Sequence, residues 1–139
     1  MNSFATLSAD AAAQFKKFKI KRNPENCALI LKINRSNSLI EVEEELDNTP
    51  LLDLQDYLPT TEPRFIVYSY KFETRDGRIT YPLVLIYSSP TGINPQFSMI
   101  YTSCVASLQS SLPGVQRNYT VKDVEDLTDE WMIENLKKA

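Results

Sequence analysis

Arg64-Phe-Ile-Val-Tyr-Ser-Tyr-Lys-Phe72 is the most β-prone run in the chain, and Ile79-Thr-Tyr-Pro-Leu-Val-Leu-Ile-Tyr87 follows it closely. Asp76-Gly77 lies between them, and Asp-Gly between β-branched and aromatic runs is typical of a hairpin turn. Pro82 cannot donate to a strand ladder, so it predicts a bulge or an edge position in the second run. We expect this hairpin to form the centre of the fold.

A second hairpin is predicted upstream. Residues 27–33 form a short apolar run bounded by turn residues, which is typical of a buried strand. The chain returns over 38–44 with Ile40 and Val42 alternating with acidic residues, which indicates a strand with one wet face. Residues 117–121 are expected to form a last short strand.

Helices are predicted where a capping residue precedes apolar residues at helical spacing. The expected helices run from Ser8 to about Lys19, from Thr49-Pro50 to Pro59, from Pro95 (with Asn94 as its cap) to about Leu112, and onward from Thr128. Thr49 is expected to cap the second helix, with Pro50 at its first helical position. The third helix is the longest, and Phe97, Ile100, Cys104, Leu108 and Leu112 form its apolar stripe.

This order of elements predicts the fold class. Two hairpins with helices between them imply an α/β (α+β) fold, with a mixed central sheet of about five strands flanked by helices on both faces. The length of 139 residues suits one domain, and no repeat or linker interrupts it, so we expect a single domain over 1–139.

The composition removes most enzyme classes. Histidine is absent, which excludes the usual general base and the commonest metal ligand. The three glycines are too scattered for a phosphate-binding loop. The acids at 41–47 are able in principle to run hydrolysis, but we interpret them as the solvated face of a strand. We therefore expect no enzyme activity, no cofactor and no metal site.

The same composition limits the partners. A net charge of -3 gives no overall reason to bind nucleic acid or an anionic membrane. The aromatic residues of 64–72 are interpreted as core rather than as a base-stacking platform. Cys27 and Cys104 are expected to be buried free thiols, and with no signal peptide or membrane span the chain is expected to be soluble and intracellular.

The surface charge is unevenly distributed. Residues 16–22 hold five basic residues in seven, whereas acids concentrate at 41–47 and 123–134. Such a bipolar surface steers a macromolecular partner and fixes its orientation. From the residues alone we predict an interaction module.

Several motifs together resemble the glia maturation factor branch of the actin-depolymerising factor/cofilin homology (ADF-H) family, from about Phe15 to Leu136. They are Arg64-Phe-Ile-Val-Tyr-Ser-Tyr-Lys71, Asp76-Gly-Arg78, Tyr81-Pro82, Ser88-Ser-Pro90, Met99-Ile-Tyr101 and Glu125-Asp-Leu-Thr-Asp-Glu-Trp131. The resemblance implies the ADF-H fold, a mixed five-stranded sheet between helices.

The resemblance also implies a function. Members of this branch bind the actin-related protein two/three (Arp two/three) complex, suppress its nucleation of branched actin and dissociate daughter filaments. Residues carried over to the surface that docks on an actin-like fold are Lys19, Lys21, Arg22, Met99, Ile100, Tyr101, Glu125, Asp126 and Thr128. A second surface, toward the daughter filament at the branch junction, corresponds to Arg75, Asp76 and Arg78. The expected protein is a cytoplasmic monomer of the actin cytoskeleton and cortical patches, with possible access to the nucleus.

The long helix departs from the wider family. Relatives carry lysines there, but no basic residue occurs between Gln96 and Gln116 in this chain. Cofilin-type filament binding relies on those basic residues, so their absence favours debranching over severing. The alternative within the family remains a cofilin-like, actin-binding severing protein.

Overall fold

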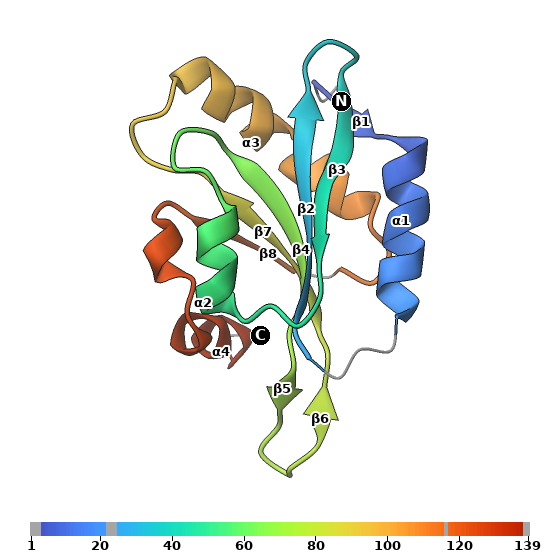
Figure 1. Cartoon of the computed structure of the whole chain (residues 1–139), viewed down its shortest axis with the longest axis vertical. Coiled ribbons are helices and arrows are strands. Elements are labelled where there is room, and N and C mark those ends of the chain that lie inside the picture. Colours follow the sequence, from blue (N-terminus) through green and yellow to red (C-terminus); the bar gives the residue numbers. More distant parts are fainter. Residues whose placement is uncertain (1–3, 22–24, 116, 138–139) are drawn as a thin grey trace.

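A computed structural model describes residues 4–21, 25–115 and 117–137. Its main sheet has six strands in the order β1-β3-β2-β4-β7-β8 (Figure 1). These strands are β1 (Thr6–Leu7), β2 (Cys27–Asn34), β3 (Leu39–Leu46), β4 (Arg64–Ser69), β7 (Leu83–Ser88) and β8 (Arg117–Val121). The helices are α1 (Ala9–Ile20), α2 (Leu51–Leu54), α3 (Pro95–Ser110) and α4 (Asp129–Lys137), with the 3₁₀ turns η1 (Gln55–Tyr57) and η2 (Val124–Asp126).

The sheet is mixed, as predicted. β2 pairs antiparallel with β3 and β4, and β4 pairs antiparallel with β7. Parallel pairs lie at both edges, β1 with β3 and β7 with β8. The sixth strand, β1, was not predicted, because two residues are too few to show a strand period.

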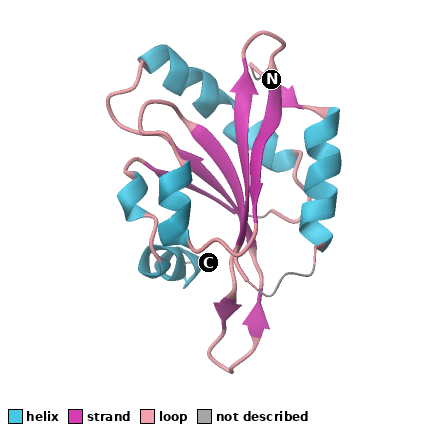
Figure 2. Ribbon diagram, viewed as in Figure 1, coloured by secondary structure: helices cyan, strands magenta, loops and turns pink. Residues whose placement is uncertain are grey.

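Helices cover both faces of the sheet (Figures 1 and 2). Odd-numbered residues of the central strands, such as Leu29, Phe65 and Leu85, pack in one cluster with residues of α1 and α3. Even-numbered residues, such as Ile30 and Ile66, pack in a second cluster with residues of α2 and α4. Alternate side chains of a strand point to opposite faces, so these strands are buried on both sides and read as unbroken apolar runs.

The aromatic residues of β4 belong to the core. Phe65 and Tyr68 are fully buried, and the Tyr68 hydroxyl donates to the carbonyl of Thr49 at 2.6 Å. Cys27 and Cys104 are both buried free cysteines. The predictions of core aromatics and buried thiols are therefore confirmed.

The predicted central hairpin divides into two parts. β4 and β7 pair only as far as Ser69 and Leu83. Beyond the bond from Tyr70 N to Pro82 O (3.1 Å), the chain forms a separate two-stranded sheet of β5 (Phe72–Glu73) and β6 (Ile79–Thr80). Pro82 lies at this division, which agrees with its missing donor. Figure 1 shows the β5–β6 hairpin projecting below the main sheet.

Capping follows the predictions at three helices. Ser8 accepts from Ala11 N at 3.0 Å, Asn94 from Gln96 N at 2.8 Å, and Thr128 from Trp131 N at 3.1 Å. The predicted cap of α2 is wrong: Pro50 itself occupies the cap position, and the Thr49 hydroxyl donates instead to the carbonyl of Asp47. Among the described residues, none of the helices has the length and apolar character needed to cross a membrane.

Candidate protein-binding surface

Lys21 follows the last turn of α1 and is tied to β3 and the segment after it. Its ammonium group donates to Glu45 at 2.5 Å and to Asp47, and it lies 5.5 Å from the Phe18 ring. Burial lowers the pKa of Lys21, but the hydrogen bonds that its ammonium group donates to both carboxylates outweigh this effect and leave the pKa raised. The charge of Lys21 is therefore largely paired with two carboxylates, which its position in the basic run 16–22 does not indicate.

Lys19 differs from Lys21. It is exposed on α1, and its ammonium end lies against Gly114, where a Cβ atom would come within 3.2 Å of Nζ. Gly114 has a φ of +95°, a conformation that suits glycine. Of Lys19 and Lys21, Lys19 is thus the cation that faces solvent. Arg22 lies outside the described residues.

The three predicted residues of α3 have different surroundings. Met99 is 69% exposed and Ile100 is half-buried. Tyr101 is only 3% exposed, its hydroxyl accepts from Ile33 N at 3.0 Å, and its ring packs on Phe65. Sequence reasoning placed Tyr101 on the binding surface; its side chain instead lies in the core and ties α3 to β2.

The exposed face of α3 is polar but uncharged. The Ser103 hydroxyl donates to the carbonyl of Ile100 at 2.8 Å, and that of Ser110 to Ala106 at 3.1 Å. These hydroxyls already hydrogen-bond to their own helix. Surface contacts from α3 therefore depend on apolar side chains such as Met99 more than on polar ones.

Glu125, Asp126 and Thr128 lie between β8 and α4. Both acids are exposed in η2. Thr128 is half-buried and its hydroxyl caps α4. The Gln55 side chain donates to the carbonyl of Leu127 at 2.8 Å and so anchors this turn to η1. The two carboxylates thus project from a fixed backbone.

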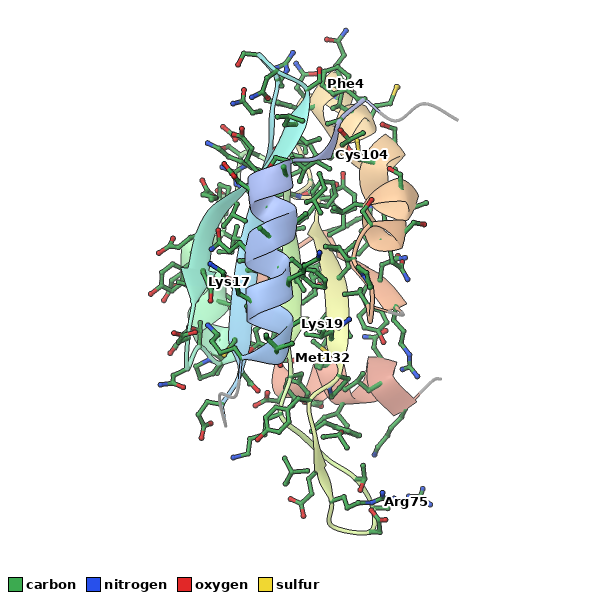
Figure 3. The ribbon with its side chains drawn as sticks, turned by 90° about the vertical axis from the view of Figure 1, so that its right-hand side faces the viewer. Phe4, Lys17, Lys19, Arg75, Cys104 and Met132 are labelled. Carbon is green, nitrogen blue, oxygen red and sulfur yellow. The ribbon has the colours of Figure 1, made fainter. Side chains whose placement is uncertain are left out.

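The hairpin tip carries Arg75, Asp76 and Arg78, all exposed. Asp76 pairs with Arg78 at 3.1 Å and accepts from the Thr74 hydroxyl. Hydrogen bonds from Thr74 and then Arg78 hold the pKa of Asp76 below its ordinary value. Figure 3 shows Arg75 at the end of the hairpin, distant from Cys104 in α3.

The predicted docking residues do not form one patch. The start of α3 lies at the upper left of Figure 1, η2 at the left and the end of α1 at the lower right. Lys19 and Lys21 instead line a groove with residues at the base of the β5–β6 hairpin. Arg117 lines the same groove and was not singled out from the sequence.

The acids at 41–47 are less solvated than predicted. Arg64, 6% exposed, donates to Glu43 at 2.8 Å and to Glu62 at 2.9 Å. The hydrogen bond from Arg64 lowers the pKa of Glu43. For Glu45, burial acts to raise the pKa, but hydrogen bonds from Lys21 and Gln14 outweigh it. Part of this acidic run therefore binds neighbouring elements rather than water.

Comparisons with known proteins cover nearly the whole chain. The family model described as cofilin/tropomyosin-type actin-binding protein matches residues 4–137. Glia maturation factor beta of Mus musculus is 37% identical over 130 residues, which covers 94% of this chain and 91% of the mouse protein. Glia maturation factor of Drosophila melanogaster is 32% identical over 136 residues, or 98% of each chain.

Solved structures agree with these relatives. The solution structure of glia maturation factor from Caenorhabditis elegans superimposes with a TM-score of 0.82 at 28% identity, covering 96% of this chain and 98% of that one. The cofilin of Streptomyces griseoflavus gives a TM-score of 0.84 at 20% identity, covering 97% and 98%, and shows the shared fold. The chain therefore belongs to the ADF-H family of cofilin-like proteins and, within it, to the glia maturation factors.

Proposed function

We propose that this protein binds the Arp two/three complex, inhibits its nucleation of branched actin and promotes the release of daughter filaments. The observation that carries the proposal is the uncharged exposed face of α3 in a chain that belongs to the glia maturation factors. Cofilin-type filament binding relies on basic residues in this helix, and none is present here. A cofilin-like severing activity is the alternative that the experiments below test.

The mechanism is differential binding rather than a covalent step. Lys19, Met99 and the acids of η2 do not form one patch, but each is exposed on an element held by the core, so each is accessible to a partner without rearrangement. A protein that binds the branch junction more tightly when the daughter filament is detached shifts the equilibrium toward debranching. No cofactor is required, and we place this activity in the cytoplasm at the actin cortex.

The direct test compares binding to the complex with binding to actin filaments. Purified Arp two/three complex should be retained by the immobilised protein in a pull-down. In a co-sedimentation assay, the protein should not sediment with actin filaments. Retention of filaments without the complex would transfer the assignment to the cofilin-like alternative.

The basic segment provides a sharper version of this test. Lys19→Ala should weaken binding to the complex with unchanged stability, because exposed charges steer association but add little to folding. The matched control is Lys17→Ala, which removes another exposed cation from the last turn of α1. If both variants bind as the unmodified protein does, α1 is not part of the interface. The combined change of Lys19, Lys21 and Arg22 to alanine tests the whole segment.

Lys21→Ala is expected to act partly through the fold. It removes the ion pairs with Glu45 and Asp47, so a small loss of stability should accompany any loss of binding. A strong binding defect with an unchanged melting curve would instead assign Lys21 to the interface.

A further inference from the structure

A hollow lies beside the β5–β6 hairpin, lined in part by Phe72, Thr74, Thr80 and Tyr81. Among the described residues, the pairing of β8 with β7 begins at Arg117, opposite Val84. The end of α1 and the loop containing Gly114 border this space, which forms a groove of about 980 Å³. The size falls within the range of ligand-binding clefts.

The charge of this groove differs from that of the whole chain. Its described lining contains the cations Lys19, Lys21 and Arg117 and no carboxylate, although acids outnumber bases in the sequence. Lys21 is already paired with two carboxylates. Arg117 uses one nitrogen to donate to the carbonyl of Leu136 at 3.0 Å, and its guanidinium has further donors.

Lys19 and Arg117 both line the groove. Lys19 lies against Gly114, which is only three residues before Arg117. Cations that line one groove present a combined positive field, which the carboxylates of a ligand neutralise. Figure 3 shows Lys19 and Lys17 on different sides of α1, and Lys17 is not among the residues that line the groove.

Apolar side chains line the groove as well. Phe72, Leu83 and Leu136 are half-buried and Tyr81 is 40% exposed. Apolar surface that stays partly wet gains roughly 25 cal/mol per Å² when a ligand covers it. An aromatic or large aliphatic side chain fits this chemistry.

We propose that the groove binds an extended acidic peptide segment of a partner protein, with its carboxylates at Lys19 and Arg117 and one large apolar side chain over Phe72 and Leu83. The hairpin projects beside the groove, so a flat anionic membrane has poorer access to it than a single chain. This site does not rest on the function proposed above, and it is tested without the Arp two/three complex.

The experiment measures the fluorescence anisotropy of a labelled peptide of glutamate and glycine with a central tryptophan, titrated with the full-length protein. Binding should weaken as salt is raised, and Lys19→Glu should weaken it about tenfold, because one attraction becomes a repulsion. Arg117→Gln keeps a donor for Leu136 O but removes the charge, and should also weaken binding. Lys17→Glu is the matched control and should change the affinity less than about twofold.

Two further peptides separate charge from apolar contact. Replacement of glutamate by glutamine, or of tryptophan by alanine, should each reduce binding. In nuclear magnetic resonance spectra, the shifts should concentrate at residues 69–84 and 114–117. Equal effects of Lys17→Glu and Lys19→Glu would overturn the proposal, as would equal binding of the glutamine peptide. It would also be overturned if phosphatidylserine vesicles, or a second copy of this chain, bound through Lys19 while the acidic peptide did not.

Discussion

Tyr101→Phe removes one oxygen atom from the interface between α3 and β2. The Tyr101 hydroxyl accepts from Ile33 N at 3.0 Å, and both residues are at most 6% exposed, so water cannot replace the lost acceptor. Burial raises the pKa of Tyr101 more than the Ile33 hydrogen bond lowers it, so the hydroxyl stays neutral at physiological pH. An unsatisfied buried N–H costs about 1–3 kcal/mol of unfolding free energy.

Urea denaturation followed by circular dichroism measures this loss. With a slope of about 2 kcal/mol per molar, the midpoint should fall by about 0.5–1.5 M at an unchanged slope. The matched control is Tyr119→Phe, whose hydroxyl makes only a 3.5 Å contact with Asn135 O in a half-buried position. That control should cost less than about 0.5 kcal/mol.

Partner binding should separate the two possible roles of Tyr101. Because the side chain is in the core, Tyr101→Phe should bind the Arp two/three complex with normal affinity at low temperature, where the variant is folded. An unchanged urea midpoint combined with weaker binding would refute this reasoning, since it would mean that the hydroxyl reaches the partner.

Three further outcomes are expected. Replacing Arg75 and Arg78 together by alanine should leave stability and affinity for the soluble complex near normal but slow branch dissociation under microscopy; an unaffected rate would make the tip a simple connector. Thr128→Ala removes the cap of α4 and should cost about 0.5–2 kcal/mol in thermal or urea unfolding. Arg64 holds the pKa of Glu43 below 4.5, so charged Glu43 stabilises the fold at neutral pH, and this contribution is lost as the pH falls through the folded-state pKa. When the pH is lowered from neutral to below about 4.5, the free energy of unfolding should therefore fall less in Glu43→Gln than in the unmodified protein. Equal decreases in the two proteins would argue against the pairing.

Local patterns predicted most of the fold, because capping residues and apolar spacing act over a few neighbours. The helix starts at Ser8, Asn94 and Thr128 needed only the adjacent sequence. The division at Pro82 was foreseen only as a bulge or edge, since the local sequence does not show how far β4 and β7 stay paired.

The candidate site was harder to predict, because it depends on contacts between distant elements. The burial of Tyr101 did have a signal: it lies four residues after Phe97 and three before Cys104, on the apolar stripe. No local signal places Lys19 and Arg117 in one groove, because they come from elements far apart in the sequence. The pairing of Lys21 with Glu45 likewise crosses from one element to another.

The division of the central hairpin also makes its tip exchangeable. The ladder of the main sheet closes at Ser69 and Leu83, and a single backbone bond from Tyr70 to Pro82 lies between that closure and the tip. Phe72 still packs against the core, but residues 73–79 form a tip whose length and charge are free to vary without any change in the register of the buried strands. Grafting the corresponding loop of a severing relative onto this frame should transfer whatever that loop recognises, and leave the exposed residues of α1, α3 and η2 as they were.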